Sequence, residues 1–205
     1  MYNLSLTTLL SLPVFPLNPT QNDTANSMNL HFTAGVVSPS ELISIGPEMT
    51  LKYEFLYSHP FVLRTGLDYR FGRMNQLKYP QGDYHGFTFS AEWLYYKGPH
   101  RMKGFVGAGV VYNYSLVETD KRAADSVLAA EQISDVRIDP RLGYRIIFGV
   151  RRSELWSFEL RISDIRTNLV YQRDLGPNRY SLEKQRIKLS DIRVSLGYLL
   201  PLKRF

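Results

Sequence analysis

The sequence has no cysteine among its 205 residues, which excludes disulfide frameworks and thiolate metal sites. It also lacks any run near the roughly 18 apolar residues that a membrane-spanning helix requires, so only strands remain as a route across a bilayer. Histidine is scarce, with four residues, and no pair has the spacing of a metal site. We therefore expect no metal ion and no cofactor.

A concentrated basic region is also missing. Lys and Arg outnumber Asp and Glu by 25 to 19, but they are spread along the chain and form no run. We therefore expect no nucleic-acid partner. With 44% hydrophobic and 21% charged residues, the chain is long enough for one folded unit, either a single all-β barrel or a large soluble domain.

What the sequence does contain is a repeated two-sided pattern, seen most clearly between residues 61 and 72. Phe61, Leu67 and Phe71 fall on one parity, whereas Arg64 and Arg70 fall on the other. Successive side chains of a strand point to opposite faces, so one face is apolar and the other charged. Because this pattern recurs in eight segments, we predict an eight-stranded antiparallel up-and-down transmembrane β-barrel with a charged, side-chain-filled lumen.

Short and long connections alternate between the eight segments. The short ones suit tight turns at one end of a barrel, and the long ones suit loops at the other. Good helix formers between residues 123 and 131 predict a short helical turn in the third loop. The expected turns are 58–60, 97–101 and 152–154, and the expected loops are 38–46, 74–83, 119–136 and 173–185.

The polar parity of the strands carries charges of both signs. Charged groups with little water around them must pair, and Arg suits bidentate pairing with carboxylates. Eight strands enclose a space that side chains can fill, so we interpret the lumen as an ion-pair network and not as a pore. The expected network comprises Glu48, Lys52, Glu54, Arg64, Asp68, Arg70, Glu92, Arg141, Arg145, Arg151, Glu159, Arg161, Asp164, Arg166, Asp191 and Arg193.

The apolar parity changes twice near the end of the chain. After residues 163–164 the apolar residues continue from Ile165 to Tyr171 on the opposite parity. If they face lipid, a β-bulge must lie there. Ile187 and Leu189 are likewise out of phase with the strand that follows, which predicts a second bulge. In the sixth segment, the pattern places Ile138 outward.

Residues 1–27 differ from the barrel segment, residues 28–205. Their apolar part is followed by prolines that interrupt regular structure. Two interpretations remain open. The segment is either the remnant of a secretory signal, although it lacks a basic start and a small-residue cleavage site, or a mature extension that lies in the periplasm or contacts a partner.

No combination of residues forms a recognisable catalytic site, and we expect none. An outer-wall hydrolase needs a Ser and a His close together, but Ser90 points inward while His85 lies on the other parity. His31 is expected inward, in a hydrogen-bonded structural role. The glycines between residues 104 and 109 lie within a strand and precede no helix, so they do not form a phosphate loop.

Eight amphipathic strands, a charged interior, alternating short turns and long loops, and the terminal Phe205 resemble the small outer-membrane barrels of the outer membrane protein A and X type. The resemblance covers residues 28–205 and implies insertion into the outer membrane of a Gram-negative bacterium. Phe205 does not share the parity of the apolar residues in the last strand, which suggests that residues 203–204 form an overhang. The turn asymmetry places both termini in the periplasm.

The resemblance implies no single activity, so three functions stay open. The first is a non-catalytic structural or interaction role in the cell envelope, with the loops or the outer wall contacting partners or lipopolysaccharide. The second is an accessory subunit of a larger outer-membrane complex, and the third is a lipid A-modifying enzyme. The loop cations that we consider for lipopolysaccharide phosphates are Lys78, Lys121, Arg122, Arg173, Arg179 and Lys184.

Overall fold

The computed structural model describes residues 27–40, 42–58, 60–74, 82–99, 101–119, 133–152, 155–174 and 179–204. In these ranges no helix is long and apolar enough to span a membrane. The strands are β1 (Ser27–Val37), β2 (Gly46–Ser58), β3 (Phe61–Met74), β4 (Gly82–Lys97), β5 (Met102–Thr119), β6 (Ile133–Arg152), β7 (Trp156–Asp164), β8 (Arg166–Asp174), β9 (Tyr180–Lys188) and β10 (Asp191–Arg204).

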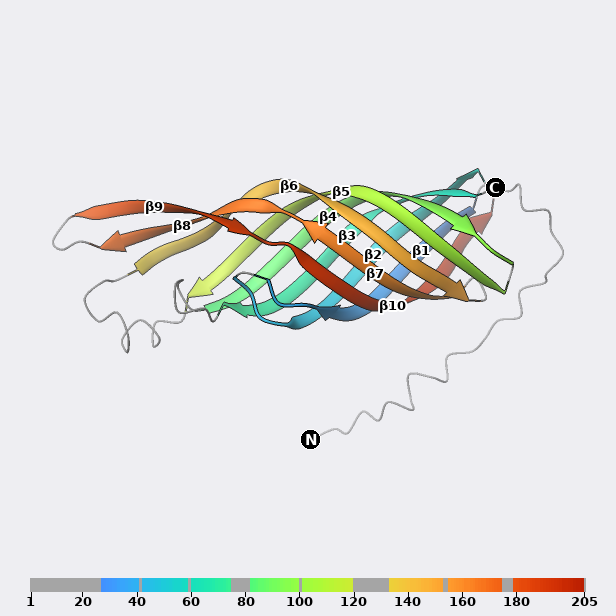
Figure 1. Ribbon diagram of the computed structural model, residues 1–205, viewed down its shortest axis with the longest axis horizontal. Coiled ribbons are helices and arrows are strands. Elements are labelled where there is room, and N and C mark those ends of the chain that lie inside the picture. Colours follow the sequence, from blue (N-terminus) through green and yellow to red (C-terminus); the bar gives the residue numbers. More distant parts are fainter. Residues whose placement is uncertain are drawn as a thin grey trace, which may run out of the picture.

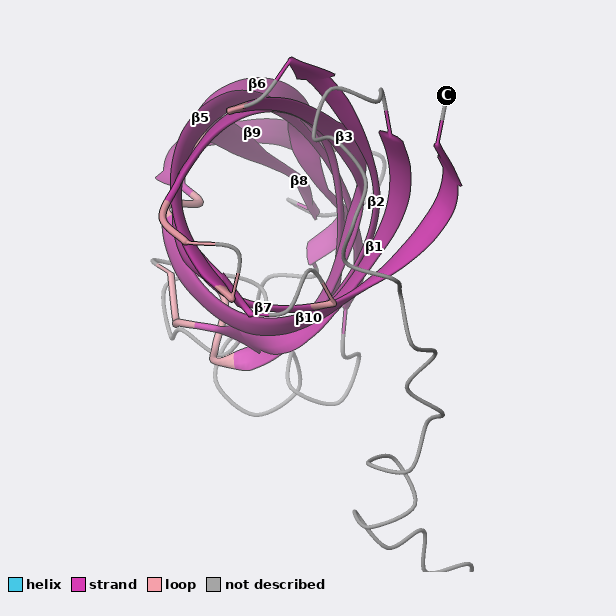
Figure 2. Cartoon of the chain, turned by 90° about the vertical axis from the view of Figure 1, so that its right-hand side faces the viewer, coloured by secondary structure: helices cyan, strands magenta, loops and turns pink. Residues whose placement is uncertain are grey.

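The strands close into a single antiparallel barrel, seen along its axis in Figure 2. β1 pairs with β2 on one side and with β10 on the other, which completes the ring. β8 continues the line of β7, and β10 continues the line of β9. The ten segments therefore make eight strands across the barrel. The predicted eight-stranded transmembrane barrel is confirmed.

The outer wall is apolar over most of its height. Met49 is 66% exposed and Trp93 is 59% exposed, values far outside those of core residues. A continuous apolar surface of this kind is unfavourable in water and favourable against lipid. At the short-turn end, aromatic side chains pair on the outer wall, with ring centroids 5.4 Å apart for Phe61 and Tyr95. These aromatic residues are typical of a membrane interface.

Neither of the two bulges predicted for the end of the chain reverses the faces of the strands. Asp191 lies opposite Ser163 and Lys188 lies opposite Arg166, and both pairs belong to one unbroken register. Ile165, expected to face lipid, is 1% exposed and points into the barrel. The prediction was wrong because Asp164 and Arg166 take the outward positions on either side of Ile165, so Ile165 turns inward.

The change of phase occurs instead in β6. Five residues separate Ile138 from Tyr144, whereas only four separate their partners Leu169 and Asp164, so β6 carries one extra residue. Pro140 lies in this irregular stretch, where a bulge tolerates its missing N–H group. Ile138, predicted to face outward, is therefore buried inside the barrel.

The strands on the long-loop side extend further than the sequence predicts. β8 continues to Asp174 and β9 begins at Tyr180, so most of the expected loop 173–185 is a hairpin. Figure 1 shows β8, β9 and the start of β6 projecting beyond the other strands. The helical turn expected at 123–131 and Phe205 lie outside the described residues. The expected overhang is wrong, because Arg204 pairs with Ser27.

Single cysteine substitutions test this register directly, because the chain has no cysteine of its own. We expect a water-soluble maleimide to label Arg166→Cys quickly, since Arg166 lies on the outer surface. Its neighbour Thr167 is 2% exposed, so Thr167→Cys stays protected until the barrel unfolds. The opposite order of labelling rates would favour the bulge that the sequence predicts.

Candidate functional site: the filled lumen and the outer rim

The barrel interior holds a continuous network of buried charges. Thirteen of the sixteen expected residues take part, and all of them are buried, with at most 4% of their surface exposed, except Arg151, whose side chain is 11% exposed. Each comes from the inward parity of its strand, where residues two apart point to the same face. The members are Glu48, Lys52, Glu54, Arg64, Asp68, Arg70, Glu92, Arg145, Arg151, Glu159, Arg161, Asp191 and Arg193.

Glu92 is one centre of the network. Its carboxylate accepts hydrogen bonds from Lys52 Nζ at 2.6 Å, from Arg64 Nε at 2.7 Å and from Arg145 Nη1 at 2.8 Å. Asp68 shares two of these donors, with Lys52 at 3.2 Å and Arg145 at 2.5 Å. Because each carboxylate serves several cations from different strands, the groups depend on one another and hold opposite walls of the barrel together.

His31 occupies the hydrogen-bonded structural position that the sequence predicts. Its Nε2 lies 2.8 Å from Ser157 Oγ and its Nδ1 lies 3.2 Å from Arg64 Nη1. Gly197 makes room for this arrangement, since a Cβ atom there would stand 2.3 Å from His31 Nε2. A larger residue at position 197 would displace the imidazole from the network.

The charged layer ends near both openings of the barrel. On the long-loop side, Asp191 accepts hydrogen bonds from Arg193 at 2.8 Å and from Arg70 at 3.2 Å. On the short-turn side, Arg151 donates to Glu54 at 2.5 Å, and its guanidinium lies 4.6 Å from the centre of the Tyr96 ring. The cation–π contact lets the network end against an aromatic surface instead of water.

Apolar clusters close both ends of the charged layer. The short-turn cluster contains Val62, Leu94, Tyr96, Phe105 and Ile147. Sequence reasoning missed both clusters, although the signal was present as apolar residues on the inward parity near the strand ends. The long-loop cluster contains Leu42, Ile43, Met74, Tyr84, Val111, Val136, Ile138, Ile165, Leu169, Tyr171, Ile187 and Leu189, with Val117 packed against it.

Three expected lumen residues lie elsewhere. Arg141 is exposed because the β6 bulge moves it off the inward parity. Asp164 and Arg166 lie on the outer surface, where they form an ion pair at 3.7 Å. They are outside because the register of β7 and β8 continues without the predicted slip.

Asp139 on β6 joins Asp164 on this outer surface. It accepts a hydrogen bond from Asn168 Nδ2 at 3.1 Å and lies 3.2 Å from Lys184 Nζ. Its slight burial raises the pKa of the carboxyl, but the hydrogen bonds from Asn168 and Lys184 outweigh this effect and lower the pKa below its ordinary value. Asp139 is therefore a carboxylate at neutral pH.

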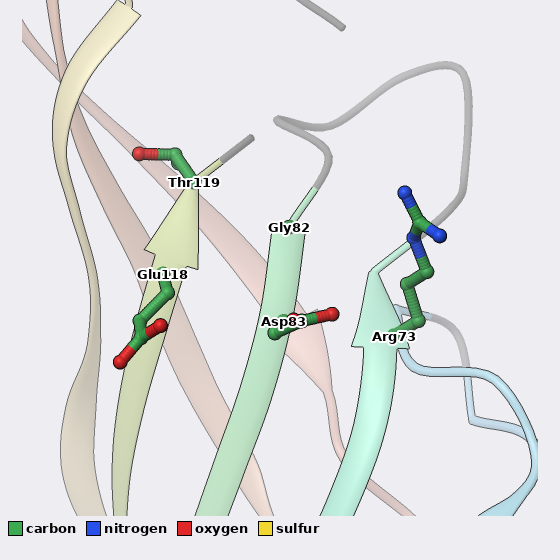
Figure 3. Close-up of a pocket in the computed structure, with 5 residues that line it drawn as sticks. All are labelled: Arg73, Gly82, Asp83, Glu118 and Thr119. Carbon is green, nitrogen blue, oxygen red and sulfur yellow. The ribbon is translucent and has the colours of Figure 1, made fainter. Parts of the chain in front are cut away.

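The described part of the outer rim holds a shallow pocket. The pocket has a volume of about 290 Å³ and lies between the ends of β3, β4 and β5, lined by Arg73, Gly82, Asp83, Glu118 and Thr119 (Figure 3). No histidine or serine lines it. In the described ranges, no cluster of three or more metal-ligating side chains occurs.

His85 and Ser90, weighed as a hydrolase pair, do not meet. His85 lies on the outer wall, where its Nδ1 is 2.9 Å from the Tyr69 hydroxyl. Ser90 is buried on the inner face, with 4% of its surface exposed. The two side chains therefore lie on opposite sides of β4, and the pair cannot act together on one substrate.

Comparison with protein-family models gives no match, and no curated protein matches the sequence. Solved structures do match. The outer membrane protein OprG from Pseudomonas aeruginosa superposes with a TM-score of 0.54 at 12% identity, over 86% of this chain and 96% of OprG. Neisserial surface protein A gives a TM-score of 0.53 at 13% identity, over 88% of this chain and all of the other. The chain has the fold of the small outer-membrane β-barrels.

Substituting one central carboxylate tests the network. Glu92→Gln removes a fully buried charge that three cations share, so we expect the free energy of unfolding to fall by about 3–5 kcal/mol. The matched control Asp164→Asn removes a half-exposed carboxylate, and we expect a loss below about 1 kcal/mol. Urea titration in lipid vesicles, followed by tryptophan fluorescence, measures both. Equal losses would contradict a mutually dependent network.

Proposed function

We propose that the chain is a sealed, non-catalytic β-barrel of the bacterial outer membrane that acts through its outer surface. The observation that carries this proposal is the filled interior, where charged side chains lie between two apolar clusters. A solute crossing the barrel would have to break paired buried charges and displace packed side chains at both ends. Conduction and transport through the lumen are therefore disfavoured.

The two different ends of the barrel support an orientation in the membrane. Residues 60 and 155 lie in the short connections at the end where β10 terminates, and β6, β8 and β9 project from the other end (Figure 1). Barrels of this architecture place short turns in the periplasm and long connections outside. We accordingly place both termini in the periplasm and the β8–β9 hairpin outside the cell.

The projecting hairpin is the part of the surface best suited to contact another protein. Tyr180 and Leu182 lie on β9 beyond the lipid-facing wall and are 61% and 67% exposed. Large apolar side chains held in water on a hydrogen-bonded hairpin are typical of interaction sites. This feature favours the role of accessory subunit in an outer-membrane complex as a second candidate function.

Planar-bilayer recording tests the sealed interior. We expect the purified barrel to insert without a stable conductance, because ion pairs and apolar side chains fill the lumen. The same preparation, incubated with lipid A, is expected to release neither fatty acid nor phosphate. A reproducible single-channel conductance would overturn the sealed barrel, and hydrolysis that depends on the added protein would overturn the non-catalytic assignment.

Co-purification from native membranes in mild detergent tests the hairpin. We expect a stoichiometric partner to be lost from the double variant Tyr180→Ser and Leu182→Ser, because both contacts become polar. The control Met102→Ser changes a side chain that is 58% exposed at the short-turn end. It is expected to retain the partner. A partner kept equally by both variants would place the contact elsewhere, and an isolated barrel in every sample would remove the subunit role.

A further inference from the structure

The outer faces of β8 and β9 change character abruptly beyond the lipid-facing wall. Ile162 and Ile192, opposite each other, are 40% and 48% exposed and belong to the apolar surface. Four residues further along each path, on the same face, Arg166 lies opposite Lys188. Both side chains are exposed, so the outer surface passes from apolar to cationic within about 13 Å along the strands.

Six exposed cations gather on this part of the outer surface, which we call the basic face. Three carboxylates lie among them: Asp139 is 3.2 Å from Lys184, Asp164 is 3.7 Å from Arg166, and the exposed Asp135 lies two residues before Arg137 on β6. In the part of the chain that the structure describes, Arg141 and Arg186 form no ion pair. The basic face consists of Arg137 and Arg141 on β6, Arg166 on β8, and Lys184, Arg186 and Lys188 on β9.

The cations of the basic face are held at fixed spacings. Lys184, Arg186 and Lys188 alternate along one strand, and two residues of a strand span about 6.6 Å. Arg166 is the direct cross-strand neighbour of Lys188, at a typical Cβ separation of about 5 Å. The long-loop cluster supports the same strands from inside through Leu169. The strand backbone thus fixes the positions from which these cations project.

The rest of the described rim does not share this charge. On the outer faces of β3, β4 and β5, one cross-strand row contains Arg73, Asp83 and Glu118, as Figure 3 shows. Two of these three side chains are acidic. The described part of the rim is therefore asymmetric in charge, and an anion that approaches it is attracted to the β6, β8 and β9 side.

We propose that the basic face binds the phosphate groups of a phosphorylated glycolipid in the outer leaflet, the lipid A portion of lipopolysaccharide. The inference rests on the proposed orientation and names the partner of that outer surface. Arg forms bidentate hydrogen bonds with phosphate, and anionic lipid surfaces attract clustered Lys and Arg. The basic face adjoins the lipid-facing wall directly, at the level where the headgroups of bound lipids lie, so acyl chains and phosphates contact the barrel together.

A charge-removal variant with a matched control tests this binding. The variant carries Arg166→Gln, Arg186→Gln and Lys188→Gln, and the control carries Lys97→Gln, Arg101→Gln and Arg152→Gln at the short-turn end, where all three cations are also exposed. Each barrel in neutral detergent is titrated with lipid A, with dephosphorylated lipid A and with inorganic phosphate. Heat-modified gel mobility verifies that all three proteins are folded.

We expect the wild type and the control to bind lipid A at least about tenfold more tightly than its dephosphorylated form, and the variant to lose this preference. A variant that keeps the preference, or a wild type without one, would overturn the proposal. If inorganic phosphate binds as tightly as lipid A, the ligand of the basic face is a free anion and not the lipid. A conducting barrel that keeps the phosphate preference would overturn only the sealed lumen.

Discussion

Charge pairing inside a closed cylinder is the constraint on which the structure depends. Eight strands leave little room for water at the axis, so inward charges must pair, and most of their partners lie on other strands. Glu92 on β4 gathers cations from β2, β3 and β6, which ties distant parts of the sequence to one register. A strand that slipped by one residue would point its charges at lipid and its apolar residues at the network.

The apolar clusters at both ends extend this constraint. Ion pairs are strong only where water is kept away, and the cluster that contains Tyr96 and Phe105 covers the network on the short-turn side. On the long-loop side, Ile43 from the connection between β1 and β2 packs into the other cluster and pairs with Met74. The barrel is therefore closed by side chains from its own strands and connections.

The alternating pattern predicted the facing of most wall residues correctly. It misjudged the facing of the strand residues on the long-loop side, for one reason. Between β1 and β5, apolar residues such as Met49 and Trp93 face lipid, and the alternating pattern suffices to place them. Apolar side chains face outward only where the strands lie within the bilayer. Leu169 and Ile187 lie beyond it, where the outside is polar and the inside is apolar, and no local pattern marks that change of surroundings.

The bulge in β6 was hidden for a related reason. Ile138 and Leu142 share a parity, so the sequence reads as one regular outward face on both sides of Pro140. Only pairing with the neighbouring strands shows the extra residue, because the register with β5 shifts there and the pairings of β6 with β8 and with β7 are offset by one residue. Long-range register thus decided the location of Arg141, which the strand's own pattern had placed in the lumen.

The inside and the outside of the projecting strands are consequently coupled. Tyr171 and Leu169 point inward from β8, and the Tyr171 hydroxyl donates a hydrogen bond to Glu183 on β9 at 2.7 Å. These inward contacts fix the hairpin, and the opposite parity then fixes the outward cations Arg166 and Lys188. Since side chains alternate strictly along a strand, packing the apolar residues inside the barrel is also what orders the cations outside it. A hairpin without this inner support would hold the same charges with far less order, and it would lose more conformational entropy on binding an anion.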